Sequence, residues 1–162
     1  MGNLFENICQ ALLSKSRLKF PFLEDVRINL IIKPLKVGSM WASKRPFHYV
    51  LIIDSHKYKG ATNRQINGAI AHELMHFETY ERYGWAKYIL DNFAFYFSKK
   101  LMTRFERDND KKTICKGFGR DLFENRSFRL SKISKSERAK ISSCYLTPNE
   151  IKKYAKSIGK WK

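Results

Sequence analysis

The sequence has no long uncharged apolar run and few cysteines. No apolar stretch in its 162 residues approaches the ~18 residues that a transmembrane helix needs, and charges interrupt the N-terminal region where a secretory signal has a continuous apolar segment. The three cysteines, Cys9, Cys115 and Cys144, are widely spaced and form no Cys-x-x-Cys pair, so the sequence indicates neither a thiolate zinc site nor a disulfide framework. We therefore expect a soluble, cytoplasmic protein with no transmembrane segment.

Acidic residues are also scarce. The chain has 32 Lys and Arg residues against 15 Asp and Glu, a formal net charge of +17. The excess is concentrated in residues 99–162, with 19 basic and 7 acidic residues, and such a surplus is typical of proteins that bind nucleic acid or anionic membranes. The basic residues are nevertheless spaced along the chain and not gathered into one arm, which favours solvated helix faces.

The apolar pattern indicates an α+β fold in one compact domain. Apolar residues make up 43% of the chain, enough for a hydrophobic core. Their spacing predicts a helix over residues 3–17, strands over Val26–Ile32 and Phe47–Ile53, and a shorter strand over Gly38–Lys44. We expect the short strand to lie at the edge of the sheet and the two richer strands to be interior.

The rest of the chain has mainly helical patterns. Thr62 and Gln65 stand three residues apart, as in a capping box, and predict a helix over about residues 63–80. Residues 84–117 are again helical in pattern, as one long helix or as two with a bend, and a less regular basic segment follows. A last helix with one apolar face is predicted over residues 148–158, because it begins with a capping residue, a proline and an acid in the right order.

One motif in the helix predicted over residues 63–80 carries metal chemistry. It reads His72-Glu73-Leu74-Met75-His76, an HExxH pattern. At about 100° per residue the two histidines lie on one face, a single turn apart, so both imidazoles can bind one zinc ion. Glu73 flanks that face, where its carboxylate can take a proton from a water molecule at the metal. The alternative is a pair of histidines on a helix surface without a metal.

A catalytic zinc ion needs a third protein ligand. None of the four histidines follows His76, so this ligand must be an acid. Glu78 and Glu81 lie on the motif helix but rotate away from the histidines. Glu106 and Asp110 share one face of the next predicted helix, so one can bind the metal while the other accepts a hydrogen bond from a ligating histidine. We favour Glu106 as the ligand and Asp110 next. The other candidates are Asp91, Asp108, Asp121 and Glu124.

The pattern His72-Glu73-x-x-His76, followed about thirty residues later by Glu106-x-x-x-Asp110, resembles the minigluzincins. These are small soluble relatives of membrane gluzincin peptidases such as the CAAX prenyl endopeptidase and the HtpX heat-shock protease. The resemblance covers roughly residues 26–122. It implies a Zn2+ ion at His72, His76 and Glu106, with Glu73 as general base and acid and Asp110 as an outer partner of the metal ligands.

The resemblance also implies an architecture. A small mixed sheet would pack on the HExxH zinc helix and on a second ligand-bearing helix, with a helical C-terminal extension. Residues 1–127 would form a zincin-like catalytic domain with an N-terminal helix, and residues 128–162 a basic helical segment packed on it. In these relatives an edge strand upstream of the motif binds extended substrate, and the corresponding residues here are Ser39, Met40, Trp41, Ala42 and Ser43. Residues 85–102, where the membrane relatives have transmembrane helices, are predicted to form a soluble packing helix, with an element on a membrane surface as the alternative.

The implied activity is peptide-bond hydrolysis by a zinc metalloendopeptidase acting on a peptide or protein substrate. The second electrophile for the oxyanion would be Arg104, Arg107, Tyr80 or Tyr145. The resemblance also suggests latency, as in a zymogen, with residues after about Phe128 occluding the cleft and Glu150 or Cys144 offering a fourth ligand. The other interpretation is that the last helix completes the core or forms a homodimer interface.

The alternative function is a catalytically silent, zinc-containing or metal-free binding module. Its basic C-terminal part, where aromatic residues alternate with Lys and Arg between Phe118 and Arg129, would contact nucleic acid by base stacking and phosphate contacts. The same aromatic residues fall at core spacing and form no recognised nucleic-acid motif. We therefore expect a nucleic-acid partner less than a peptide substrate.

Overall fold

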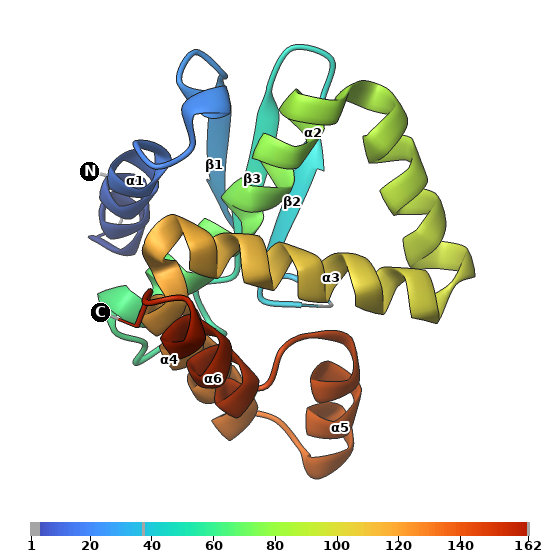
Figure 1. Cartoon of the computed structure of the whole chain (residues 1–162). Coiled ribbons are helices and arrows are strands. Elements are labelled where there is room, and N and C mark those ends of the chain that lie inside the picture. Colours follow the sequence, from blue (N-terminus) through green and yellow to red (C-terminus); the bar gives the residue numbers. More distant parts are fainter. Residues whose placement is uncertain (1–3, 37, 162) are drawn as a thin grey trace.

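The computed structural model has an α+β fold with a small three-stranded sheet (Figure 1). It describes residues 4–36 and 38–161, apart from the side chains of residues 91, 92 and 94–96. The elements are α1 (Leu4–Arg17), a 3-10 turn (Pro21–Leu23), β1 (Ile28–Ile32), β2 (Met40–Lys44), β3 (Tyr49–Ile53), α2 (Asn63–Phe97), α3 (Lys99–Thr113), a π turn (Ile114–Phe118), α4 (Gly119–Ser131), α5 (Lys135–Cys144) and α6 (Pro148–Ser157). All three predicted strands are present.

The strand order of the sheet is β1-β3-β2. β3 lies in the centre, parallel to β1 and antiparallel to β2. The prediction that the short strand is an edge is confirmed, since β2 pairs only with β3 among the described residues. The prediction that both richer strands are interior is wrong for β1, which forms the other edge and leaves Ile31 40% exposed. A sheet of three strands has only one interior position, and β3, the most apolar strand, takes it.

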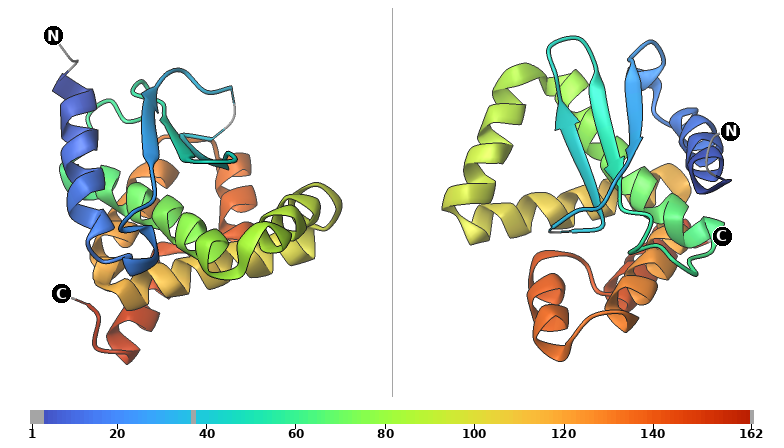
Figure 2. Two further views of the ribbon diagram at one scale, coloured as in Figure 1. Left: turned by 90° about the horizontal axis from the view of Figure 1, so that it is seen from above. Right: turned by 180° about the vertical axis from the view of Figure 1, so that it is seen from behind.

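The main core lies between the sheet and the helices α1 and α2, which cross each other at a steep angle (Figure 2). β3 is apolar along its whole length, and Leu51 and Ile53 are fully buried. Ile70 and Leu74 of α2 are fully buried on the face opposite the two motif histidines. The apolar stripe of α2 therefore packs in the main core, and the face with the two histidines points away from this core.

α2 begins at the predicted capping box. The Thr62 N–H donates to the Gln65 side chain at 2.9 Å, and the Gln65 N–H donates to the Thr62 hydroxyl at 3.2 Å. The helix kinks at Gly84, whose φ of 74° lies in the left-handed region that glycine adopts without strain. Ser98 then caps α3. Residues 84–117 therefore form two helices with a bend between them, the second of the two predicted arrangements.

The second half of α2 differs from the packing helix that we expected. It leaves several large apolar side chains more than two-fifths exposed, namely Trp85, Ile89, Leu90, Phe93 and Phe97. The helix projects with α3 away from the sheet as a hairpin, which is why few partners cover this face (Figure 1). None of the described helices combines the length and the apolar character needed to cross a bilayer.

α4 and α5 occupy the segment that we expected to be less regular. α4 buries the polar residues Asn125 and Arg126, so its inward face has no continuous apolar stripe. The spacing of apolar residues therefore does not predict this helix. α4 approaches α2 closely at Gly68, where a Cβ atom would lie 2.2 Å from the Asp121 carbonyl oxygen. This close approach brings the inward side chains of α4 next to the motif helix.

The predicted last helix is α6, which packs on α4 in a second core cluster. Ile151 and Ala155 are fully buried there against Ile114 and Leu122. The capping box between Thr147 and Glu150 is also present, as the sequence predicts. The apolar face of α6 therefore completes a core.

Candidate metal centre

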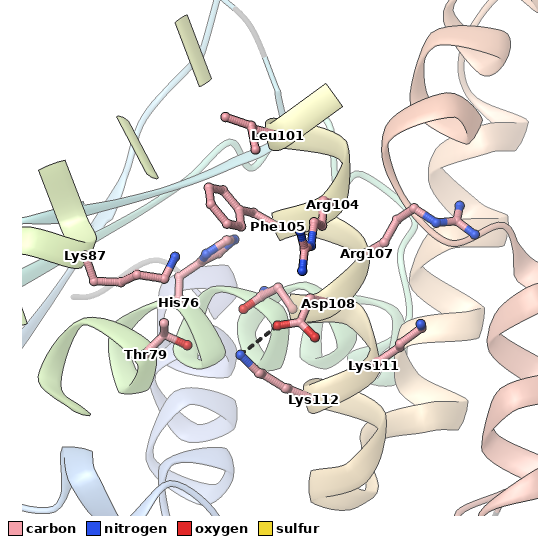
Figure 3. A pocket seen from close by; sticks show the side chains of 11 residues that line it. His76, Thr79, Lys87, Leu101, Arg104, Phe105, Arg107, Asp108, Lys111 and Lys112 are labelled. Carbon is pink, nitrogen blue, oxygen red and sulfur yellow. Dashed lines mark ion pairs between the residues drawn. The ribbon is translucent and has the colours of Figure 1, made fainter. Parts of the chain in front are cut away.

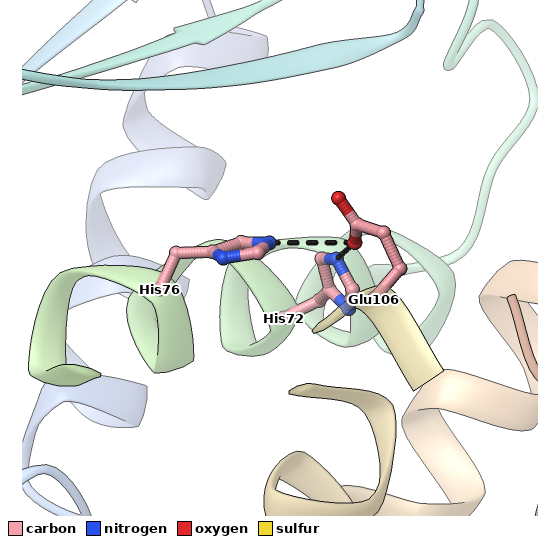
Figure 4. A group of neighbouring side chains, drawn as sticks. All are labelled: His72, His76 and Glu106. Atoms are coloured by element: carbon pink, nitrogen blue, oxygen red, sulfur yellow. Dashed lines mark hydrogen bonds and ion pairs between the residues drawn. The ribbon is translucent and has the colours of Figure 1, made fainter. Parts of the chain in front are cut away.

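The second histidine of the HExxH motif, His76, lies at a cleft between α2 and α3 (Figure 3). The cleft has a volume of about 680 Å³ and is lined by His76 and Thr79 from α2 and by Phe105 and Asn109, among others, from α3. His72 and His76 are one helical turn apart, as their spacing predicts, and both point toward Glu106 of α3 (Figure 4). The structure thus brings together the three residues that we predicted as metal ligands.

The spacing of their donor atoms suits a zinc ion. The Nε2 atoms of His72 and His76 lie 3.1 and 3.5 Å from the same Glu106 Oε2 atom, and the three donor atoms are all within 4.8 Å of one another. Ligands at 2.0–2.2 Å from a tetrahedral zinc ion are about 3.3 Å apart. The two imidazoles and the carboxylate therefore need only small shifts to bind one ion.

Asp110 holds the other nitrogen of His72. Its Oδ1 atom lies 2.9 Å from His72 Nδ1, where it accepts the hydrogen bond of that nitrogen, and the Nε2 atom of the same ring faces Glu106. A carboxylate in this position fixes the tautomer and orientation of a ligating histidine. The structure thus places Asp110 where the sequence argument and the resemblance put an outer partner.

Arg126 of α4 neutralises this fully buried carboxylate. Its Nη2 atom donates to both Asp110 oxygens at 3.0 and 3.1 Å, and the Leu146 N–H donates to Asp110 Oδ2 at 2.9 Å. Arg126 is 2% exposed, so the pair is shielded from water. Burial by itself raises the pKa of Asp110, but the Arg126 charge and the bond from His72 hold that pKa below its usual range.

The ligand carboxylate and imidazole also affect each other. Burial would raise the pKa of Glu106, but the charge of His76 and the hydrogen bonds from both histidines hold it well below its usual range. Burial would lower the pKa of His72, but Asp110 and Glu106 together raise it to about 10. Without a metal, His72 therefore carries a proton that a bound cation has to displace.

A further contact fixes α3 against α2 behind the metal centre. Asn109 is buried, and its side-chain amide donates to the His72 carbonyl at 2.9 Å. The other acids considered as ligands are engaged elsewhere: Glu78 with Lys116, Glu81 with Lys44 and Tyr49, Asp108 with Lys112, Glu124 with Arg64, and Asp121 near Arg64 and Asn67. The side chain of Asp91, another candidate, lies outside the described part of the structure; among the described side chains, Glu106 is the acid that reaches both histidines.

Glu73 lies beside the two histidines and is half-buried. Its carboxylate makes no hydrogen bond or ion pair with any of the described residues. It is close enough to Tyr145 that its charge, together with burial and the charge of Glu106, raises the pKa of the tyrosine hydroxyl. A carboxylate without a competing partner is available to accept a proton.

The C-terminal part approaches the candidate metal centre, and the sequence analysis missed the part that Arg126 plays there. The Tyr145 ring lies 5.8 Å from the His72 ring, and the Arg126 guanidinium stacks on the Tyr145 ring at 4.4 Å. Tyr80 also approaches the centre, with its ring 6.2 Å from that of His76. Arg107 is bound to Glu150 and to the Tyr145 carbonyl. No sequence signal links Arg126 to Asp110, because an arginine in a basic segment is expected to be solvated.

β2 is the strand of the sheet nearest the α2–α3 hairpin (Figures 1 and 2). The Asp54 N–H donates to the Ser39 carbonyl and the Arg45 N–H donates to the His48 carbonyl, which fixes the phase of the antiparallel ladder. In this phase the backbone N–H and C=O groups of Trp41 and Ser43 bond to β3. The backbone groups of Met40 and Ala42 point the other way, toward the free edge of the sheet. Of the predicted substrate-strand residues, Ser39, Trp41 and Ser43 therefore face β3 with their backbone groups.

Comparison with models of known families, with characterised proteins and with solved structures finds no match for this chain. The assignment of a function therefore depends on the geometry of His72, His76, Glu106 and Asp110.

Proposed function

We propose that this protein is a zinc-dependent metallopeptidase of the gluzincin type, similar to the minigluzincins, that hydrolyses peptide bonds. One observation carries the proposal: two histidines of an HExxH helix converge within 3.5 Å of a single carboxylate oxygen from a different helix. The carboxylate that orients His72 from behind adds support, because such an outer partner is a regular feature of zinc sites.

The residues around the centre have distinct roles in this reaction. His72, His76 and Glu106 hold the ion, which when bound supplies a Lewis acid for the peptide carbonyl and for water. The Glu73 carboxylate takes a proton from the attacking water molecule and gives it to the leaving amine. Asp110 and Arg126 keep His72 in the tautomer that binds the metal.

Tyr145 is the best placed of the four residues considered for the developing oxyanion. Its ring lies beside His72, and its hydroxyl keeps its proton because burial and the Glu106 charge raise the pKa. Arg107 is occupied by Glu150 and the Tyr145 carbonyl. A protonated hydroxyl can donate a hydrogen bond to the substrate oxygen as its charge grows.

The outward edge of β2 is suited to bind the substrate as an added strand. Ala42→Pro removes one outward N–H and leaves the bonds to β3, so we expect about tenfold weaker binding of an extended peptide with unchanged zinc content. Trp41→Pro removes an N–H that faces β3 and should instead destabilise the sheet. Fluorescence anisotropy of a labelled peptide and zinc analysis of each variant measure both effects. Equal peptide affinity in Ala42→Pro and the unmodified chain would exclude β2 as the substrate strand.

Binding of nucleic acid has less support, because the aromatic residues of the basic segment are engaged in packing. Phe118 is 3% exposed and stacks on Phe20, Phe128 stacks on Tyr58, and Phe123 packs on Trp161. Their faces are therefore not available to stack on bases.

Peptidase activity is tested by incubating the zinc-loaded chain with a peptide library and identifying new termini by mass spectrometry. We expect cleavage that a zinc chelator stops and that added zinc restores. Cleavage that persists after complete removal of the metal would contradict the proposed function.

A further inference from the structure

The cleft beside His76 is strongly basic on the side formed by α3. Its described lining includes five cationic side chains and one acid: Lys87, Arg104, Arg107, Lys111 and Lys112, with Asp108 (Figure 3). The residues at positions 104, 107, 108 and 111 are spaced by three and four, so they form one stripe along α3. Glu106 and Asp110 lie on a different face of α3, about 110–150° around the helix from this stripe. One helix therefore supplies both the metal ligand and the basic wall of the adjacent cleft.

Two of these cations already have carboxylate partners. Arg107 binds Glu150, which lies at the start of α6, and the strength of that pairing lowers the pKa of Glu150 to about 2. Lys112 pairs with Asp108 one helical turn away, at 2.7 Å. Their charges are thus largely compensated within the protein.

Arg104 and Lys111 are exposed and form no ion pair with the described part of the chain. The ammonium group of Lys111 lies 5.8 Å from the centre of the Tyr154 ring, and this cation–π contact leaves its charge without a carboxylate partner among the described residues. The two residues are seven positions apart, or about 10 Å along α3. Acidic side chains two or four positions apart in an extended peptide share one face, about 7 or 13 Å apart, which brackets this distance and is within reach of the long Arg104 and Lys111 side chains.

We propose that this cleft receives an acidic segment of the peptide substrate next to the cleaved bond, with Arg104 and Lys111 as its partners. This inference rests on the proposed peptidase function, since it assigns the substrate class of the same site. The cleft reaches His76, so a chain bound there lies next to the metal centre. Leu101 and Phe105 add apolar contacts for the stems of the acidic side chains.

Binding is tested on the full zinc-loaded chain with Glu73→Gln, so that the peptide stays intact. The probes are a fluorescein-labelled peptide with a run of glutamates and the same peptide with glutamine at each of these positions. We expect the glutamate peptide to bind about tenfold more tightly, and this preference to fall to about twofold in Arg104→Gln/Lys111→Gln. The control with the same charge change, Lys153→Gln/Lys156→Gln on the exposed face of α6, should keep the preference.

The outcomes separate this inference from the proposed function. An equal loss of preference in both double variants would show a general effect of net charge and overturn the assignment of the cleft. Equal binding of the two peptides to the unmodified cleft would overturn it as well, even if the active chain cleaves peptides. Selective binding that depends on Arg104 and Lys111, in a chain that cleaves neither peptide, would instead support the cleft and contradict the peptidase function.

Discussion

Replacing Glu73 with glutamine is expected to lower the rate of peptide hydrolysis by a factor of about 10³. Glutamine keeps the size of the side chain but cannot take a proton from water. The Glu73 carboxylate has no partner among the described residues, so its loss leaves no buried charge unpaired and should not disturb the fold. Zinc content should stay the same, because His72, His76 and Glu106 remain. Single-turnover rates on a cleaved peptide, with zinc analysis of the same sample, measure both quantities.

His72→Ala is the matched comparison for this variant. It removes a metal ligand and should abolish both zinc binding and hydrolysis. A Glu73→Gln chain that hydrolyses peptide at the original rate would show that another group moves the proton.

Replacing Arg126 with methionine is expected to lower the free energy of unfolding of the metal-free chain by about 3–5 kcal/mol. The variant removes the guanidinium that binds both oxygens of the fully buried Asp110, which then keeps only the His72 ring as a charged partner. A buried carboxylate that loses its ion pair keeps the cost of desolvation without compensation. Urea unfolding of the chelator-treated protein, followed by circular dichroism, measures the change.

Two further variants distinguish the effect of losing the Arg126–Asp110 ion pair from the effect of losing an arginine side chain in general. Arg129→Met changes a half-buried arginine three residues further along α4 that makes no ion pair with described residues, and should cost less than about 1 kcal/mol. Arg126→Met/Asp110→Asn removes both charges and should recover part of the loss, because no charge stays buried alone. An Arg126→Met chain as stable as Arg129→Met would contradict the role assigned to the pair.

The elements that carry the metal ligands could be predicted from local patterns. The capping box at Thr62 and Gln65 marks the start of α2, and the spacing of His72 and His76 places both imidazoles on one face whatever the tertiary structure. Because the other histidines precede the motif, the third ligand is predicted to be an acid, with Glu106 favoured over Asp110. These arguments need only the geometry of a helix.

The surroundings of the metal centre could not be predicted in the same way. Arg126 reaches Asp110 because α4 packs closely on α2, and that approach depends on the fit of backbones at Gly68. Tyr145 comes next to His72 through the contact of Leu146 with Asp110. Polar residues that are buried by tertiary contacts interrupt the apolar periodicity of their helices, so the buried face of α4 cannot be recognised from the sequence.

The zinc content of the purified full-length chain tests the central claim most directly. After incubation with zinc and removal of the excess, elemental analysis should find about one zinc ion per chain, and His72→Ala, His76→Ala and Glu106→Ala should each lose most of it. Glu73→Gln should retain it. A folded chain that binds no zinc under these conditions, or a Glu73→Gln chain that loses the metal as completely as His72→Ala, would contradict the account.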